Sequence, residues 1–145
     1  MARLLPGTAV RVRRGRRRDF EAVRALLAAP AGERLARVFR RILADLGTDV
    51  YVAEDEGGEI VGMVSVLYAR SLARGGLAAL LEGARARGPA LLGGLVAFAE
   101  ERARKRGCRR LAAWVDADDV DLRSALLARG YQTGELLVTE LAEAS

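Results

Sequence analysis

The sequence predicts a mixed α/β fold in which helices cover both faces of one β-sheet. Apolar residues recur at helical spacing in four separate segments, and short apolar runs typical of strands lie between them. Three of these runs follow one another without a helix, which gives the order β-α-α-β-β-β-α-β-α-β-β. We expect residues 1–145 to form one domain, because no linker or repeat interrupts the pattern and the length suffices for a core.

The first part of the chain predicts one strand and two helices. Residues 8–13 alternate apolar and charged side chains, as a half-buried strand does. Asp19 can cap the helix that follows, and residues 30–32, which include a proline and a glycine, end it. A second helix, residues 33–46, carries its apolar residues on one face and ends at Gly47.

Three consecutive strands are predicted next. Residues 49–54 and 60–68 are rich in β-branched residues and form a hairpin around the turn Gly57-Gly58. Residues 77–82 consist mainly of alanine and leucine, for which propensity alone favours a helix. We assign a buried strand, because the run is short and glycines bound it on both sides.

The longest predicted helix runs from residue 89 to residue 106. Pro89 suits its first turn, and Gly107 suits the position just after its end. Residues 110–115 then form a strand, in which we expect Trp114 to belong to the core.

The C-terminal part predicts one more helix and two strands. Either Asp118 or Asp119 caps a helix that runs to about residue 129 and ends at Gly130. Residues 131–133 and 135–141 are then expected to form an antiparallel pair that closes the sheet.

The composition argues against several classes of protein. The net charge is +5, but the bases are almost all arginine, as a GC-rich genome would encode, and no aromatic residue interrupts the basic run 11–18. This argues against a nucleic-acid partner. With no histidine and one cysteine, the chain excludes zinc sites, His-activated nucleophiles and an internal disulfide. No membrane-length apolar stretch or signal peptide is visible, so we expect a cytoplasmic protein without a membrane partner.

Four short patterns share the order and spacing of one protein family. They are the strand and helix of residues 10–23, the sequence Arg85-Ala-Arg-Gly-Pro-Ala90, the helix exit of residues 103–111, and the box Leu126-Leu-Ala-Arg-Gly-Tyr131. Together with the element order, they resemble the GNAT acyltransferase superfamily over essentially the whole chain. The resemblance implies a mostly antiparallel sheet, acetyl-coenzyme A as cosubstrate without a metal, an amine acceptor, direct attack of the amine on the thioester and, by analogy, a homodimer.

The resemblance implies a pyrophosphate site at the start of the longest helix. The positions that match the family signature are Arg85, Ala86, Arg87, Gly88, Pro89 and Ala90. The N-terminus of a helix offers unpaired backbone N–H groups and a partial positive charge, which suit a phosphate. Gly88 and Ala90 lack bulk that would keep phosphate oxygens away, and the two arginines add charge-assisted contacts.

Three further cofactor residues follow from the same resemblance. The backbone of Leu80 and Leu81 is expected to pair with the pantetheine and to supply the donor for the thioester oxygen. Asp119 stands where the family commonly has an asparagine. The chain departs from the family in the glycine pair 93–94 within the helix, and in a shortened passage from the central strand to the cofactor loop.

Glu82 is the candidate general base, since it ends the central strand near the expected cleft and could act through a water molecule. Glu54 and Asp55 are weaker candidates beside the hairpin turn. The family usually places its tyrosine acid where this chain has Leu126, which has no proton to give. Tyr131 is therefore our candidate acid, with Tyr68 and solvent as alternatives; both tyrosines have an alternative interpretation as core residues.

The remaining candidates favour structural roles. Cys108 is expected to be a buried, inert thiol, because no histidine can activate it. The aspartates 116, 118, 119 and 121 have the spacing of helix caps and first-turn acids, without the glycine and distal glutamate of a calcium loop. We expect no metal site.

The sequence thus favours an N-acetyltransferase that acts on an amine of a small molecule or peptide. Arg70 and Arg74, beside the expected acceptor region, hint at an anionic acceptor. The alternative is a non-catalytic relative that binds acyl-CoA or a protein partner, which Leu126 and the shortened loop favour.

Overall fold

The computed structural model describes residues 2–142 and has a six-stranded sheet in the order β1-β2-β3-β4-β5-β6. Every neighbouring pair is antiparallel except β5 and β6, which are parallel. The strands are β1 (Arg3–Leu4), β2 (Arg11–Arg14), β3 (Thr48–Glu54), β4 (Ile60–Ser71), β5 (Gly76–Ala86) and β6 (Leu111–Ala113). The helices are α1 (Phe20–Leu26), α2 (Glu33–Ala44), α3 (Pro89–Lys105) and α4 (Val120–Ala128), and a 3-10 turn, η1 (Arg17–Asp19), precedes α1.

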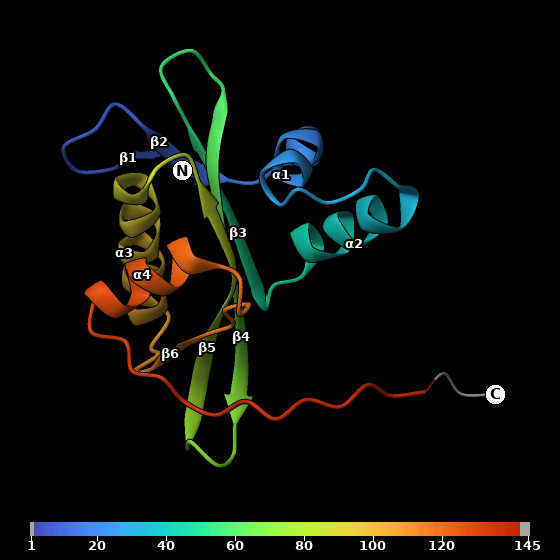
Figure 1. The fold of residues 1–145 in the computed structure, drawn as a ribbon, viewed down its shortest axis with the longest axis vertical. Coiled ribbons are helices and arrows are strands. Elements are labelled where there is room, and N and C mark those ends of the chain that lie inside the picture. Colours follow the sequence, from blue (N-terminus) through green and yellow to red (C-terminus); the bar gives the residue numbers. More distant parts are fainter. Residues whose placement is uncertain (1, 143–145) are drawn as a thin grey trace.

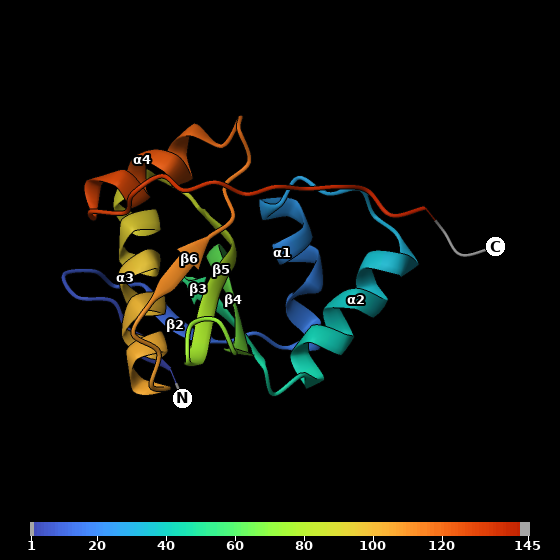
Figure 2. The same ribbon diagram turned by 90° about the horizontal axis from the view of Figure 1, so that it is seen from below.

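The sheet lies between two helical layers (Figure 1). Figure 2 shows α3 and α4 on one side of the strands and α1 and α2 on the other. The larger core cluster fills the space under α3 and α4, and a smaller cluster fills the space under α1 and α2. The predicted architecture, a mostly antiparallel sheet with helices on both faces, is confirmed.

Burial of β3 and β4 on both faces explains their sequences. Six of the seven residues of β3 are buried, and residues 61–66 of β4 are buried without interruption. Strands covered on both sides read as continuous runs of apolar residues. Gly62 in β4 allows α3 to lie close, because a Cβ atom there would come within 2.8 Å of the Cδ1 atom of Leu95.

Several local predictions are confirmed. The alanine- and leucine-rich run is part of β5, so its length and bounding glycines outweighed helix propensity. Pro89 begins α3, and Gly107 follows its end with a φ of +92°, which glycine adopts at low cost. Asp119 is the cap of α4, and Cys108 is buried.

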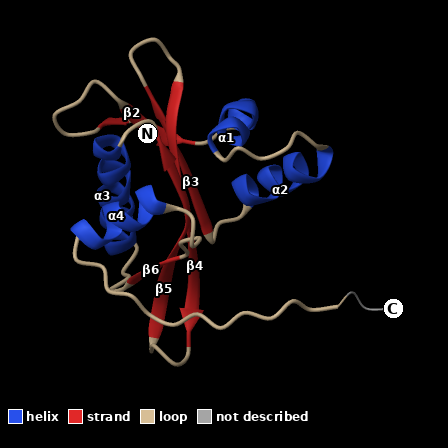
Figure 3. Ribbon diagram, in the orientation of Figure 1, coloured by secondary structure: helices blue, strands red, loops and turns tan. Residues whose placement is uncertain are grey.

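The predicted closing strand pair, residues 131–133 and 135–141, is wrong. Residues 131–142 form no strand and appear as loop in Figure 3. A hairpin without a sheet to join is marginal in water, and this segment crosses no strand of its own chain closely enough to pair with it. The outer edge of β6 is consequently left open.

Smaller differences concern element ends. The short strand β1 was not predicted; it pairs with the start of β2. The second helix ends at Ala44, and the strand expected at residues 110–115 is reduced to Leu111–Ala113. Within residues 2–142, no helix combines the length and apolar composition needed to cross a membrane.

Candidate functional site

The two parallel strands of the sheet separate after three residue pairs. Ala79, Leu80 and Leu81 of β5 pair with Leu111, Ala112 and Ala113 of β6. The last bond runs from the backbone N–H of Trp114 to the carbonyl oxygen of Leu81, at 2.9 Å. Beyond this point β5 continues to Ala86, and within residues 2–142 it pairs there with β4 alone. The separation leaves the β6 side of the β5 backbone without a strand partner.

A β-bulge lies at the same place. Ser65 of β4 is opposite Gly83, and Val66 is opposite Leu81, so Glu82 is an extra residue on β5. A bulge bends its strand and re-aims its side chain, which is why bulges recur beside active sites. Glu82 is exposed, and it lies where the two strands diverge.

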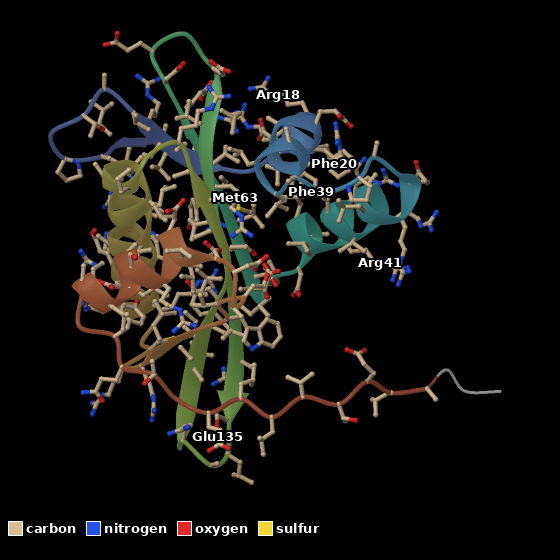
Figure 4. The ribbon with its side chains drawn as sticks, in the orientation of Figure 1. Arg18, Phe20, Phe39, Arg41, Met63 and Glu135 are labelled. Carbon is tan, nitrogen blue, oxygen red and sulfur yellow. The ribbon has the colours of Figure 1, made fainter. Side chains whose placement is uncertain are left out.

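A cleft of about 780 Å³ occupies the divergence. Its volume is that of a pocket for a cofactor or a substrate of similar size. Leu27 and Met63 reach it from the α1 side of the sheet, and Leu122 reaches it from the α4 side. Figure 4 shows Met63 between the sheet and the helices that carry Phe20 and Phe39. The cleft therefore passes between the strands from one face of the sheet to the other.

The charged lining of the cleft comes from β5 and from the segment before α4, and the C-terminal segment adds Leu136, Leu137, Val138, Thr139 and Leu141. Glu82, Gly83 and Arg85 lie on one side, and Asp116 and Asp119 lie on the other. The sequence analysis found Glu82, Arg85 and Asp119, but it did not predict Leu27, Met63 or Asp116 as cleft residues. The two apolar residues carry no signal that separates them from core residues.

α3 begins at Pro89, four positions after Arg85, the last residue of β5 that lines the cleft. Gly88, which precedes the helix, has a φ of +96°, and a Cβ atom there would meet nothing within 4 Å. No side chain caps the helix, and Pro89 has no N–H group. The backbone donors of the first turn and the space beside Gly88 thus suit an anion, such as the pyrophosphate of coenzyme A.

Two arginines flank this opening. Arg87 is exposed and pairs with Glu59 at 2.9 Å. Arg85 donates from Nη1 to Oδ2 of Asp119 at 2.8 Å, across the cleft. The other carboxylate oxygen of Asp119 accepts the backbone N–H of Leu122 at 3.1 Å and so caps α4. The structure therefore brings Arg85 and Asp119 together as an ion pair.

Leu80 and Leu81 lie within the ladder between β5 and β6. Leu81 is fully buried, and its carbonyl oxygen is occupied by the N–H of Trp114. Ala86 ends β5, and Ala90 lies in the first turn of α3. The backbone of β5 that has no neighbour on the β6 side begins after Leu81.

Tyr131 is not among the residues that line the cleft with Glu82. Its hydroxyl donates to Oε2 of Glu100 at 3.0 Å, and Glu100 also binds Arg129 through both carboxylate oxygens. Burial, and then the hydrogen bond to Glu100, raise the pKa of Tyr131 above its ordinary value. The hydrogen bond from Arg129 lowers the pKa of Glu100. Tyr131 therefore holds the end of α4 against α3, outside the cleft lining.

The other candidates have structural surroundings. Leu126 is buried in the core under α3 and α4. Tyr68 lies in β4 with the guanidinium carbon of Arg106 4.4 Å from the centre of its ring, and burial raises its pKa. Trp114 was expected in the core, but it follows β6 and is 48% exposed, because the strand ends one residue earlier. Among residues 2–142, no three His, Cys, Asp or Glu side chains are grouped to hold a metal ion.

Comparison with known proteins identifies the family. The model of the acetyltransferase (GNAT) family matches residues 13–131. No curated protein sequence matches the chain. Among solved structures, a transcriptional regulator from Bacillus halodurans C-125 superposes with a TM-score of 0.78 at 28% identity, covering 91% of this chain and 99% of that one.

Two acetyltransferases show the same fold at lower identity. The aminoglycoside antibiotic 6'-N-acetyltransferase AAC(6')-Ih from Acinetobacter baumannii has a TM-score of 0.76 at 16% identity, with 94% and 99% of the chains covered. A ribosomal-protein-alanine N-acetyltransferase from Brucella melitensis biovar Abortus 2308 has a TM-score of 0.75 at 19% identity, with 92% and 100% covered. The family match extends over most of the sequence, and the chain belongs to the GNAT acetyltransferase family.

Proposed function

We propose that the protein is an N-acetyltransferase that transfers an acetyl group from acetyl-CoA to an amine. One observation carries the proposal: the uncapped N-terminus of α3 at Gly88 comes shortly after the part of β5 whose bulged Glu82 and Arg85 line the cleft. The first feature suits the pyrophosphate, and the second places a carboxylate where two strands diverge.

The cofactor would bind along β5 and at the start of α3. Arg85, Arg87 and the first-turn N–H groups beside Gly88 would hold the pyrophosphate. The pantetheine would lie beside β5 as a neighbouring strand does. Because Leu80 and Leu81 already pair with β6, we assign the donor for the thioester oxygen to the next backbone N–H groups along β5.

Glu82 would act as the general base. The amine nitrogen attacks the thioester carbon, the C–N bond forms, and the C–S bond breaks as the thiolate leaves. The ammonium proton passes to Glu82 through a water molecule. Since Tyr131 is bound to Glu100 and Leu126 has no proton to give, the thiolate takes its proton from solvent.

The charge of the cleft favours a cationic acceptor. Glu82, Asp116 and Asp119 line it, whereas Arg85 is the basic residue among its lining and is already paired with Asp119. Two carboxylates therefore face the cleft without a basic partner from its lining. This replaces the hint of an anionic acceptor, because the arginines at positions 70 and 74 are exposed near the β4–β5 turn, outside the cleft lining.

Two measurements test the proposal. Calorimetric titration with acetyl-CoA should show saturable one-to-one binding, and free thiol should appear when diamines or lysyl peptides are added but not with amino diacids. Glu82→Gln should lower kcat by about 100-fold or more without changing acetyl-CoA affinity. Glu56→Gln, an exposed glutamate in the β3–β4 turn, is the matched control and should leave the rate unchanged. An unchanged rate in Glu82→Gln would remove Glu82 from this role.

A non-catalytic acyl-CoA-binding protein is the second candidate. The buried Leu126 at the family's acid position and the hydrogen bond that holds Tyr131 on Glu100 favour it. Acetyl-CoA binding without thiol release from any amine of the panel would support this candidate over the enzyme.

A further inference from the structure

Trp114 combines an exposed indole with a position in the lining of the cleft. It is the only tryptophan of the sequence and is 48% exposed, although tryptophan is on average a highly buried residue. Leu111, Ala113 and Val115 pack against the core under α3 and α4. Since side chains alternate along a strand, Trp114 points to the opposite face of the sheet, from which Leu27 also reaches the cleft.

The indole of Trp114 has no cationic partner in the described chain, although arginine is abundant. Within residues 2–142, four arginine guanidiniums lie 4.4 to 5.9 Å from the centres of aromatic rings, and these rings belong to Tyr51, Tyr68 and Phe98. Among Phe, Tyr and Trp, tryptophan attracts a cation most strongly. The described residues therefore leave the ring best suited to a cation free at the cleft.

The cleft offers more negative charge than one reacting amine can use. Arg85, the basic residue of the lining, is already paired with Asp119. Glu82 and Asp116 therefore face the cleft without a basic partner from its lining. If Glu82 receives the reacting amine, Asp116 is a second carboxylate, two positions after Trp114. A carboxylate close to an aromatic ring suits an alkylammonium ion.

The apolar lining indicates what joins the two charges of the acceptor. Leu27 and Met63 line the cleft from the α1 side, and the C-terminal segment adds four apolar side chains. Burial against such side chains stabilises methylene groups, whereas hydroxyl groups buried there would lose their hydrogen bonds with water. The lining therefore favours an alkyl chain over a polyhydroxylated one.

We infer that the acceptor is an alkyl diamine, whose far ammonium group binds at Trp114 and Asp116 while its near amine faces Glu82. The inference rests on the proposed function and narrows its substrate class. Both amines of such a molecule are protonated at neutral pH, so two positive charges meet two carboxylates. The near amine gives up a proton before it attacks the thioester, and the far one stays charged. Trp114 is thus a specificity-determining residue.

Fluorescence titration tests the site without any reaction, because all tryptophan emission of the chain comes from Trp114. Cadaverine, an alkyl diamine, should change the emission saturably and bind about tenfold or more tighter than pentylamine, which has the same carbon chain and one amine. Asp116→Asn should weaken cadaverine binding about fivefold or more. Asp118→Asn is the matched control, because Asp118 is exposed and outside the cleft lining, and it should bind like the unaltered protein. Equal affinity for the two amines would overturn the inference.

Steady-state kinetics separate binding of the far end from the chemical step. Trp114→Leu should raise KM for cadaverine about fivefold or more and leave kcat within about twofold, because the ring binds the end that does not react. KM for pentylamine should not change, and Trp114→Phe, which keeps a weaker aromatic face, should give an intermediate KM for cadaverine. A merely structural role would affect both amines alike, so an equal rise in both KM values would overturn the inference.

The diamine site and the transferase activity can fail separately. Thiol release from acetyl-CoA with equal kcat/KM for cadaverine and pentylamine would overturn the diamine site and leave the transferase standing. If neither amine released thiol, the transferase proposal would fail, and the fluorescence titration would still decide the site. A clear preference for cadaverine in that titration would support the site, and equal affinity would overturn it.

Discussion

The pyrophosphate assignment can be tested with two glycines at opposite ends of α3. Gly88 and Gly107 have φ values of +96° and +92°, and a Cβ atom at either position would meet nothing within 4 Å. Replacing either with alanine therefore introduces the same backbone strain and no clash. Each change should lower the free energy of unfolding by about 1–2 kcal/mol, the cost of an L side chain in this conformation.

The two substitutions should differ in acetyl-CoA binding. A methyl group at Gly88 would occupy the space through which phosphate oxygens reach the first-turn N–H groups of α3. Loss of one hydrogen bond to a charged group costs about 1.5–3 kcal/mol, so Gly88→Ala should weaken acetyl-CoA binding at least tenfold. Gly107 lies 19 positions further along the chain, at the other end of the helix, and Gly107→Ala should bind like the unaltered protein.

Thermal unfolding and calorimetric titration on the same samples provide the readouts. Both variants should lose a few degrees of Tm, as expected for about 1–2 kcal/mol in a chain of this size. The reasoning would be refuted if both bound acetyl-CoA equally well, or if both lost affinity equally. The first result would place the pyrophosphate elsewhere, and the second would mean that affinity follows stability.

Two further predictions concern charged pairs. Arg13→Met should lower the free energy of unfolding by about 3 kcal/mol at pH 7. The Arg13 and Asp19 side chains are only 10% and 5% exposed, so the substitution leaves a buried carboxylate without its arginine partner. Arg11 is exposed, and the control Arg11→Met should lower the free energy of unfolding by less than about 0.5 kcal/mol. Burial alone would raise the pKa of Asp19, but the hydrogen bonds from Arg13 and from the backbone N–H of Arg16 outweigh burial and lower that pKa. The stabilisation of the fold by the Arg13–Asp19 pair is therefore present above about pH 4 and is lost as the pH falls further. Urea unfolding should show a smaller difference in the free energy of unfolding between Arg13→Met and the unaltered chain at pH 3 than at pH 7. A difference that is the same at both pH values would contradict the argument. Asp119→Asn should tighten acetyl-CoA binding about threefold or more, because it releases Arg85 from its ion pair while asparagine still caps α4. Weaker binding, measured by calorimetry, would instead mean that Asp119 positions Arg85.

Features that depend on local chemistry were predictable from the sequence. Proline and glycine marked the ends of α3 because each acts through its own backbone. The short length of the apolar run and the bounding glycines located β5 even though alanine and leucine favour helices. Residues 85–90 span the passage from β5 to α3, but β5 extends four residues beyond its predicted end to Ala86, so only Arg87 and Gly88 form the connection.

Features that depend on long-range pairing were not predictable. The bulge at Glu82 exists because β4 and β5 pair with unequal spacing, which the residues of β5 alone do not reveal. Trp114 is exposed because β6 ends where its partner diverges, not because of its own neighbours in sequence. Residues 135–141 have a strand sequence, but within the described chain they pair with no strand, although the outer edge of β6 is open.

The helices α3 and α4 pack against each other but begin in opposite ways, and the difference argues for a ligand at α3. Asp119 caps α4 with its own side chain, so this chain can satisfy a helix N-terminus where it needs to. At α3, as at α2, an uncapped glycine precedes the helix, but Gly88 has a φ of +96° whereas Gly32 is extended, so α3 both leaves its first-turn donors without a cap and requires the conformational freedom of glycine. A second local cost, the bulge at Glu82, lies on the strand that leads directly into this helix. Both features lower the stability of the fold, and both lie where β5 leads into α3, whereas the neighbouring helix α4 has a side-chain cap. A bound ligand explains this placement better than the stability of the fold does.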